Sequence, residues 1–531
     1  MIRRGIDRVF ERRLADLVNY RQTNALQGGL KGVEKESLRV TPKGRISMKP
    51  HPRGLGSPLT NEHITTDYSE ALLELVTPAF TESWELLQYL CDIHQFVYRH
   101  LGDELLWATS MPCAIDGDAS IPIAQYGSSN VGRMKTVYRN GLGLRYGRVM
   151  QAISGVHFNY SFPAHFWPIL QDLTHTRRGG GDFISESYFA LLRNYRRHGW
   201  LVLYLFGVSP ALCQSFLSAP DEDLKELKAG TLYAPYATSL RMSDLGYRNR
   251  NQAAVEVSVN SLEEYLRDLM RAAHTPHPPF AALGVKVNGE YRQLNANVLQ
   301  IENEYYSAIR PKRVPRAGEL TGQALARGGV EYVEVRALDL DPFETLSIGH
   351  TELCFIEALL VLLLIKDSPP IDRSEQEAVD HNQLLVARRG REPGLRLISD
   401  GRPVPLQDWV AGLLDAMQGV CELLDGRDAE RPYARALAAQ RDKLAQPQLL
   451  PSARLLRELL EHEQGFAAHA LLAAAAHRAA VLARPVSQAA EEALRVQAED
   501  SLERQARMDA GVSGDFDDYL RARFVMQLTK A

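Results

Sequence analysis

Carboxylates stand at alternate positions in segments whose composition predicts β-strands. In the segment 32–40, Glu34 and Glu36 are two residues apart, beside the β-branched Val33. Side chains alternate between the two faces of a strand, so these acids share one face about 7 Å apart, while Val33 and Lys35 point the other way. Two like charges at this separation repel each other unless a cation lies between them. Taken alone, the pair predicts either a solvated strand edge or half of a metal site.

Two other predicted strands carry polar groups on one face. Glu334 and Arg336 share a face of the segment 328–342, which has the strongest strand pattern in the chain. His157 and Asn159 share a face of another segment that is otherwise fit for burial. A histidine in such a place is either a satisfied structural residue or a metal ligand. The strand that carries Glu334 therefore repeats the pattern around Glu34.

The remaining acids of this set are Asp67 and Glu74. They belong to the segment 64–76, whose second half fits a helix or a buried strand, and in a strand their spacing requires a bend before they can meet. The candidate metal ligands are Glu34, Glu36, Asp67, Glu74 and Glu334, with His157 as a nitrogen donor. An oxygen-rich set of this kind suits Mg²⁺ better than zinc, with Mn²⁺ as the alternative.

The common nucleotide-binding and hydrolase motifs are missing. The chain holds no GxxxxGK[ST] loop, and Gly141-Leu142-Gly143 does not continue as a GxGxxG fingerprint after a strand. A GxSxG elbow and an HExxH pair are also missing, which argues against serine hydrolases and zinc proteases. A run of cations predicts either a solvated face or a phosphate grip. It consists of Arg310, Lys312, Arg313 and Arg316.

Hydrophobic spacing and turn residues predict the elements that position these groups. Helices are expected at 1–22, at 81–101 with Thr81 or Ser83 as cap, and at 187–206; strands at 152–161 and 293–301; a hairpin at 41–48; and long loops at 111–147 and 233–247. From residue 367 onward the sequence predicts helices at 452–484, with a break at Gly465, at 487–508 and at 516–528. We therefore expect an α+β domain over 1–366 that carries the site, and a mostly helical region over 367–531 packed on it.

Composition sets the class of molecule. The chain has 531 residues, of which 45% are hydrophobic and 24% charged, and a net charge of -4. These values are typical of a soluble globular protein. The net charge shows no excess of positive charge for binding nucleic acid or an anionic membrane. The longest apolar run, 353–365, is too short to span a bilayer and predicts a buried helix. The N-terminus lacks the apolar core of a signal peptide, so we expect a cytoplasmic protein. Five scattered cysteines without a CxxC pair argue against a disulfide framework or a structural zinc site.

Eight blocks in order carry a resemblance to a known family. They read GVEKESLRV, LTNEHITTDYSEALLELVTP, AQYGSSNVGRMKTVYR, ISGVHFNYS, YLFGVSPALC, PYATSLRMSDLGY, NVLQIENEYYSAIRPKR and GGVEYVEVRALDLDPF. Over about residues 30–366, and more weakly to the end, the chain resembles the proteobacterial glutamate-cysteine ligases. The resemblance implies an α+β fold related to the catalytic part of glutamine synthetase. In that fold an antiparallel sheet curves into a half-barrel with helices outside it.

The resemblance also implies the activity and the residues that carry it. Members of this family join L-glutamate to L-cysteine with ATP, through a γ-glutamyl phosphate, in the first step of glutathione biosynthesis. The metal ligands of the family fall on the six residues collected above, Glu334 being also catalytic. The cysteine site falls on Tyr68, Tyr138, Leu142, Gln151, Arg241, Tyr247 and Tyr306. Arg139 and Arg336 fall where the family contacts the substrate carboxylate or the transferred phosphoryl oxygens.

Two departures from the family pattern and two alternative functions stay open. Lys35 replaces a common arginine but lies off the acid face, whereas Tyr68 replaces a common phenylalanine and adds a hydroxyl to the expected thiol pocket. The alternatives are a related carboxylate-amine ligase that uses another amine, and a non-catalytic ligand-binding protein on the same fold. The expected partners are small molecules only, and the expected state is a monomer.

Overall fold

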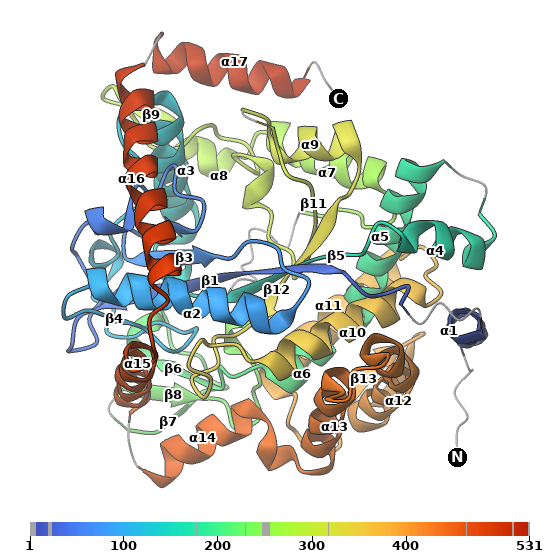
Figure 1. Cartoon of the computed structure of the whole chain (residues 1–531). Coiled ribbons are helices and arrows are strands. Elements are labelled where there is room, and N and C mark those ends of the chain that lie inside the picture. The colour runs from blue at the N-terminus through green and yellow to red at the C-terminus, as the bar shows by residue number, and fades with distance from the viewer. Residues whose placement is uncertain are drawn as a thin grey trace.

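An open antiparallel sheet of seven strands lies at the centre of the computed structural model (Figure 1). The structure describes residues 7–19, 24–176, 179–228, 230–246, 255–316, 318–462, 465–511 and 514–528. The strand order is β11 (Ile309–Lys312), β12 (Tyr332–Leu338), β5 (Val156–Ser161), β1 (Leu30–Val40), β3 (Leu72–Val76) and β2 (Ile64–Thr66), with β4 (Leu105–Leu106) paired to the end of β1. Every pair is antiparallel, which confirms the predicted sheet.

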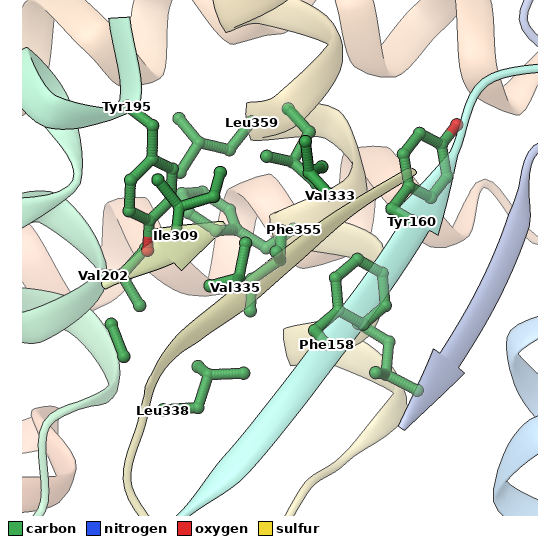
Figure 2. Close-up of a cluster of buried hydrophobic side chains, with 14 of the residues drawn as sticks. Phe158, Tyr160, Tyr195, Val202, Ile309, Val333, Val335, Leu338, Phe355 and Leu359 are labelled. Atoms are coloured by element: carbon green, nitrogen blue, oxygen red, sulfur yellow. The ribbon is translucent and has the colours of Figure 1, made fainter. Parts of the chain in front are cut away.

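One face of this sheet is apolar and packs on helices. Val33 of β1 and Val335 of β12 both pair with Phe158 of β5, and all three side chains are fully buried. Figure 2 shows Phe158 and Val335 in the apolar cluster that Phe355 and Leu359 of α10 (His350–Ile365) complete. Burial of this face against α10 holds the sheet in place, because apolar area removed from water is the main stabilising contribution.

The apolar run at 353–365 forms the buried part of α10, as predicted. Glu357, the one acid in the run 353–365, is buried and lies 2.6 Å from the Lys31 ammonium group. It also accepts a hydrogen bond from the Tyr433 hydroxyl. A buried carboxylate requires such partners, because an unpaired charge in the core is very costly. In the part of the chain that the structure describes, no single helix is both long and apolar enough to cross a membrane.

Most of the predicted helices are present with shifted ends. Up to β12 the helices are α1 (Arg8–Asn19), α2 (Ser83–His100), α3 (Asn130–Tyr146), α4 (Phe166–Thr174), α5 (Gly180–His198), α6 (Trp200–Phe206), α7 (Leu262–His274), α8 (Pro278–Ala282) and α9 (Thr321–Gly328). The helix expected at 187–206 is therefore two helices that meet at Gly199. Helix α2 begins after Glu82 with no side-chain cap, so the caps predicted at Thr81 or Ser83 were wrong.

The C-terminal part is helical, as predicted, except for one small hairpin. After α10 follow α11 (Arg373–Arg389), α12 (Leu406–Asp425), α13 (Pro432–Ala445), α14 (Pro451–Glu461), α15 (Phe466–Leu482), α16 (Gln488–Ala510) and α17 (Phe516–Leu528). The sequence did not predict the hairpin of β13 (Arg396–Ser399) and β14 (Arg402–Pro405). Helices α12 and α13 pack on α10, and α15 and α16 pack on α2. A domain boundary at residue 366 stays a prediction.

Two further small sheets lie outside the central one. One consists of β6 (Ala211–Cys213), β8 (Thr231–Tyr233) and β7 (Lys225–Glu226), and the other of β9 (Lys286–Val287) and β10 (Glu290–Tyr291). The strand expected at 293–301 was wrong: these residues form an irregular segment. Side chains replace the ladder there, since the amide of Gln293 donates to Phe280 O and the amide of Asn295 donates to Gln300 O. Such local bonds compete with regular pairing.

The segment expected to be a loop at 111–147 contains α3. Three glycines in α3 made the segment unlike a helix by propensity, because glycine is a poor helix former. All three are required by packing: a Cβ at Gly132 would overlap the Tyr126 backbone, one at Gly141 the Gln300 side chain, and one at Gly143 the Tyr68 hydroxyl. Tertiary packing therefore overrides local propensity here, and Ser129 begins the helix by accepting a hydrogen bond from the Gly132 N–H.

One pair of cysteines is bonded. Cys113 and Cys213 form a disulfide whose Cα atoms are 5.4 Å apart, so the expectation of no disulfide was wrong for this pair. The two residues are 100 positions apart in the sequence, and no spacing motif connects them. Cys91, Cys354 and Cys421 are free and buried, as expected of small core residues.

Candidate active site

Five neighbouring strands each contribute a polar side chain to the face opposite the apolar one. The register pairs Glu34 of β1 with His157 of β5, and Glu36 with Glu74 of β3. Glu334 of β12 pairs with Asn159 of β5 on one side and with Arg310 of β11 on the other. The segment 64–76 is neither one helix nor one strand but the hairpin of β2 and β3, and this turn brings Asp67 back toward Glu74. The bend that the spacing required is therefore present.

The acids converge on the His157 ring. Its Nδ1 atom lies 3.2 Å from Glu34 Oε2 and 3.7 Å from Glu334 Oε1, and its Nε2 atom lies 3.6 Å from Glu36 Oε1. Val33 and Val335 lie in the apolar core, and the Lys35 ammonium group lies 2.8 Å from His94 Nε2. The three glutamates therefore share one side of the sheet, as expected for Glu34 and Glu36, and Val33, Lys35 and Val335 lie on the other side.

Three members of this cluster lie close enough together to hold one metal ion. Ligand atoms of Glu34, Glu74 and His157 all lie within 4.8 Å of one another. Burial and the charges of neighbouring acids, Glu34 first, raise the pKa of Glu74 well above its ordinary value, and burial also raises the pKa of Glu36. Buried carboxylates in this arrangement suit a hard divalent cation, which would relieve their repulsion. The donor set therefore fits Mg²⁺.

Part of the cation run faces the same cluster. Because β11 alternates, Arg310 and Lys312 point to the acid face, and the Lys312 ammonium group lies 3.3 Å from Glu334 Oε1. Burial alone would raise the pKa of Glu334, but the neighbouring charges, Lys312 first and then Arg336, together hold this pKa well below its ordinary value. Arg313 points elsewhere and donates to Gly329 O. The cation run is thus divided between the two predicted alternatives, since Arg310 and Lys312 face the acid cluster and Arg313 does not.

A cavity adjoins the acid cluster and collects most of the predicted substrate residues. Glu36, Asp67, Arg139 and Arg336 line it where it meets the cluster, and the predicted cysteine-site residues that line it are Tyr68, Tyr138, Leu142, Gln151 and Tyr306. Arg139 is fixed there, because its Nε–H donates to the backbone oxygen of Asp67. Arg336 is fixed by Glu334, whose Oε2 atom is 3.4 Å from its Nη1 atom.

One predicted residue, Arg241, lies behind the cavity wall. Arg241 is fully buried behind it, where its Nη2 atom donates to Arg336 O at 3.0 Å and its Nη1 atom lies 3.7 Å from Asp339 Oδ1. It therefore supports the strand that presents Arg336. Tyr247 lies outside the described residues.

The cavity also contains residues that the sequence reasoning missed. They are Tyr146, Met150, Asn303 and Glu304, and Arg310 of the predicted cation run lines the cavity as well. Glu304 is buried and accepts hydrogen bonds from the Tyr146 hydroxyl at 2.6 Å and from Arg145 Nη1 at 3.0 Å. The signal for Tyr146 was present but unused: Tyr138, Leu142 and Tyr146 are spaced by four, which places them on one face of a helix. Reading this segment as a loop concealed the pattern.

Comparison with known proteins identifies the family. A family model described as Glutamate-cysteine ligase matches residues 14–386. The chain belongs to this glutamate-cysteine ligase family. The glutamate-cysteine ligase of Alcanivorax borkumensis is 47% identical over 519 residues, which cover 97% of this chain and 99% of that relative. The glutamate-cysteine ligase of Azotobacter vinelandii is 48% identical over 517 residues, which cover 97% of this chain and 98% of that relative.

Solved structures match the fold of this glutamate-cysteine ligase family member. The crystal structure of glutamate-cysteine ligase from Francisella tularensis in complex with AMP has a TM-score of 0.89 at 34% identity, covering 95% of this chain and 99% of that chain. A bifunctional glutathione synthetase from Pasteurella multocida shares the fold, with a TM-score of 0.72 at 23% identity, covering 92% of this chain and 58% of that chain.

The departure from the glutamate-cysteine ligase pattern at Tyr68 lies beneath α3. The Tyr68 ring lines the cavity, but its hydroxyl is buried and lies against Gly143. Among the described residues this hydroxyl has no hydrogen-bond partner. The hydroxyl is therefore enclosed against α3, and its expected place in the thiol pocket stays a prediction.

We expect Tyr68→Phe to raise the free energy of unfolding by about 1 kcal/mol, because a buried donor without a partner is removed. The KM for cysteine should stay within about twofold of wild type, since the hydroxyl is enclosed against α3. Gly143→Ala should lose stability alone and recover it when combined with Tyr68→Phe, because the new methyl group overlaps the hydroxyl. Denaturant unfolding of the four proteins and steady-state kinetics measure both effects. A large rise in the KM of Tyr68→Phe would place the hydroxyl in the thiol pocket after all.

Proposed function

We propose that this chain joins the γ-carboxylate of L-glutamate to the amine of L-cysteine with ATP, through a γ-glutamyl phosphate, to give γ-glutamylcysteine, ADP and phosphate. The observation that carries the proposal is the junction of two features. A cluster of carboxylates fit for Mg²⁺ meets a cavity that holds two fixed arginines, Arg139 and Arg336. Family membership supports the same reaction.

Each half of the site has its own part in this reaction. A carboxylate is a poor electrophile, so the glutamate γ-carboxylate must first become an acyl phosphate. Glu34, Glu36, Asp67, Glu74, His157 and Glu334 would hold Mg²⁺. When bound, the metal supplies charge neutralisation at phosphate oxygens.

The cations of the chain act on the transferred phosphoryl group. Arg139 and Arg336 are held at the cavity wall by hydrogen bonding and ion pairing, so they meet phosphoryl or carboxylate oxygens without reorganisation. Lys312 lies on the other side of Glu334 and points to the same region. Fixed charges of this kind carry most of the rate in phosphoryl transfer, because the protein forms no covalent bond.

The acceptor half of the cavity orients the cysteine amine. Tyr138 and Leu142 from α3, with Tyr68, Gln151 and Tyr306, form a wall of aromatic, aliphatic and amide groups. Such a wall suits a small thiol side chain and shields the acyl phosphate from water. Arg241 supports Arg336 from behind, and the predicted role of Tyr247 belongs to the same proposal.

A coupled assay of ADP release with single substrates left out tests the proposal. Glutamate, ATP and Mg²⁺ alone should give slow release, and cysteine should stimulate it strongly. Other small amines tested in place of cysteine separate the related carboxylate-amine ligases. If cysteine gives no stimulation while another amine does, the protein is a related carboxylate-amine ligase. If no amine stimulates ADP release, the protein is a non-catalytic binding protein on this fold.

The cellular setting belongs to the same proposal. We expect the protein to act in the cytoplasm, where its substrates are made, and as a monomer, with no nucleic-acid or membrane partner. Size-exclusion chromatography with light scattering measures the oligomeric state. A mass near 59.4 kDa is expected, and twice that mass would contradict the monomer.

A further inference from the structure

The last two helices both contact α3: the end of α16 meets its start, and α17 packs on it. Figure 1 shows α16 beside α2 and α3 at one edge of the molecule, with α17 turned across its end. Helix α16 packs on α2, and α17 packs on α3. The inner face of α3 carries Tyr138, Leu142 and Tyr146 into the cavity. The C-terminal helices thus contact the same element that forms one wall of the site.

Asp509, near the end of α16, caps the chain where α3 begins. Its Oδ1 atom accepts hydrogen bonds from the backbone N–H of Ser128 at 2.9 Å and of Ser129 at 2.7 Å. The Ser129 hydroxyl in turn accepts the N–H of Gly132 in the first turn of α3. A carboxylate at this end of a helix is favourable, since unsatisfied N–H groups and the helix dipole both attract negative charge.

The approach of α16 to this point is close and is held from a second side. A Cβ at Gly127 would overlap the Asp509 carboxylate and the Gln505 amide, so only glycine allows the contact. The Ser57 hydroxyl donates to Gln505 Oε1, and the Ser57 N–H donates to Ser501 Oγ at 2.9 Å. Helix α16 therefore connects the segment before β2 to the start of α3.

Helix α17 packs on the next turns of α3. Phe516 is buried, and the Arg133 guanidinium carbon lies 4.2 Å from the centroid of its ring. Phe516 and Leu520 form an apolar cluster with Met134, against which Tyr138 packs. Tyr138 therefore has one side on the C-terminal cluster and another on the cavity. A shift of α17 would reach the cavity wall directly through this ring.

We propose that Asp509 and Phe516 are positioning residues, which fix α3 against the cavity and so set the affinity for the acceptor amino acid. The proposal rests on the assignment of Tyr138 and Leu142 to the acceptor side. Four of the five metal-binding acids come from the sheet and Asp67 from the turn after β2, and Arg139, although it belongs to α3, is anchored on Asp67 O. Loss of the C-terminal contacts should therefore move the acceptor wall and spare the ATP side.

Asp509→Ala in the full-length chain tests this. We expect the KM for cysteine to rise about tenfold, with kcat and the KM for ATP changed by less than about twofold, because the helix loses its charged cap. Asp509→Asn keeps an oxygen acceptor in place and should fall between wild type and Asp509→Ala. Glu503→Ala, at an exposed position of the same helix, is the matched control and should behave as wild type.

The readouts separate positioning from general stability. If the KM values for cysteine and ATP rise together as the unfolding temperature falls, Asp509 is merely structural and the proposal is overturned. An unchanged KM for cysteine in Asp509→Ala overturns it too. Leu142→Ala tests the underlying assignment separately. If it raises the KM for cysteine while Asp509→Ala does not, the C-terminal contact fails as a positioning device and the acceptor site stands.

Discussion

Replacing Glu334 by glutamine should lower kcat about a hundred- to a thousandfold while leaving the fold intact. Glu334 is 1% exposed and lies between His157, Lys312 and Arg336, so its charge serves the metal site and both cations at once. Glutamine has the same shape but no charge. It would leave Arg336 without its fixed partner and remove an anionic ligand from the cluster. ADP release at saturating substrate, measured over a series of Mg²⁺ concentrations, gives both the rate and the metal requirement.

The control for this variant is Glu331→Gln. Glu331 precedes the same strand, is exposed, and lies 3.6 Å from Arg313 rather than in the site. It should keep wild-type kinetics, because exposed ion pairs contribute little. Far-ultraviolet circular dichroism and thermal unfolding should be alike in all three proteins. Wild-type turnover in Glu334→Gln would remove Glu334 from the site.

Lys35→Met should change how the stability of the protein depends on pH. Lys35 is 3% exposed, and burial lowers the pKa of its ammonium group from 10.5 to about 7. Between these two values the unfolded chain holds a proton that the folded chain does not. The free energy of unfolding of wild type therefore rises with pH in this window. At about 1.4 kcal/mol per pH unit, the contribution reaches on the order of 5 kcal/mol.

The variant lacks this group, so its stability should rise less between pH 7 and pH 10. Urea unfolding at each pH, expressed as the difference between wild type and variant, cancels the other titrating groups. The His94 Nδ1 atom is 2.7 Å from Leu90 O and must donate there, so its Nε2 atom accepts from Lys35. Loss of that bond in Lys35→Met shifts the whole difference curve without changing its slope. Lys43→Met, at an exposed position, should show no slope, and parallel curves for Lys35→Met would contradict the prediction.

The sequence predicts the acid face well because a strand offers only two faces. Once Val33 and Val335 are assigned to the core, Glu34, Glu36 and Glu334 have no choice of side. The meeting of Asp67 and Glu74 was harder to predict, because a turn inside one apolar segment brings them together. Hydrophobic periodicity does not reveal such a turn. His157 was ambiguous on its own strand. Its role became visible only when the sheet placed it opposite Glu34.

The acceptor wall shows why the rest could not be predicted. Helix α3 depends on glycines that fit Gln300 and the Tyr68 hydroxyl, and these contacts are distant in the sequence. Its cap includes Asp509, 380 residues away. Local propensity holds no information about such partners, so the sequence predicted no helix here. The spacing of Tyr138, Leu142 and Tyr146 was therefore not recognised as one face of a helix. The prediction for the irregular segment 293–301 failed for another reason, because side chains close by in the sequence, such as those of Asn295 and Gln300, bond to its backbone in place of a ladder.

Strand β1 has two faces with opposite chemical demands, and this has a consequence for how the chain assembles. A slip of one residue in its pairing would carry Lys35 into the ligand cluster and drive Glu34 and Glu36 into the apolar core. That arrangement is unfavourable on both faces of the strand, so burial of apolar groups and the placement of charge both favour the same register. Binding of a divalent cation during refolding would thus report that the central sheet has closed in its correct alignment. The cation would also favour correctly aligned molecules over misaligned ones.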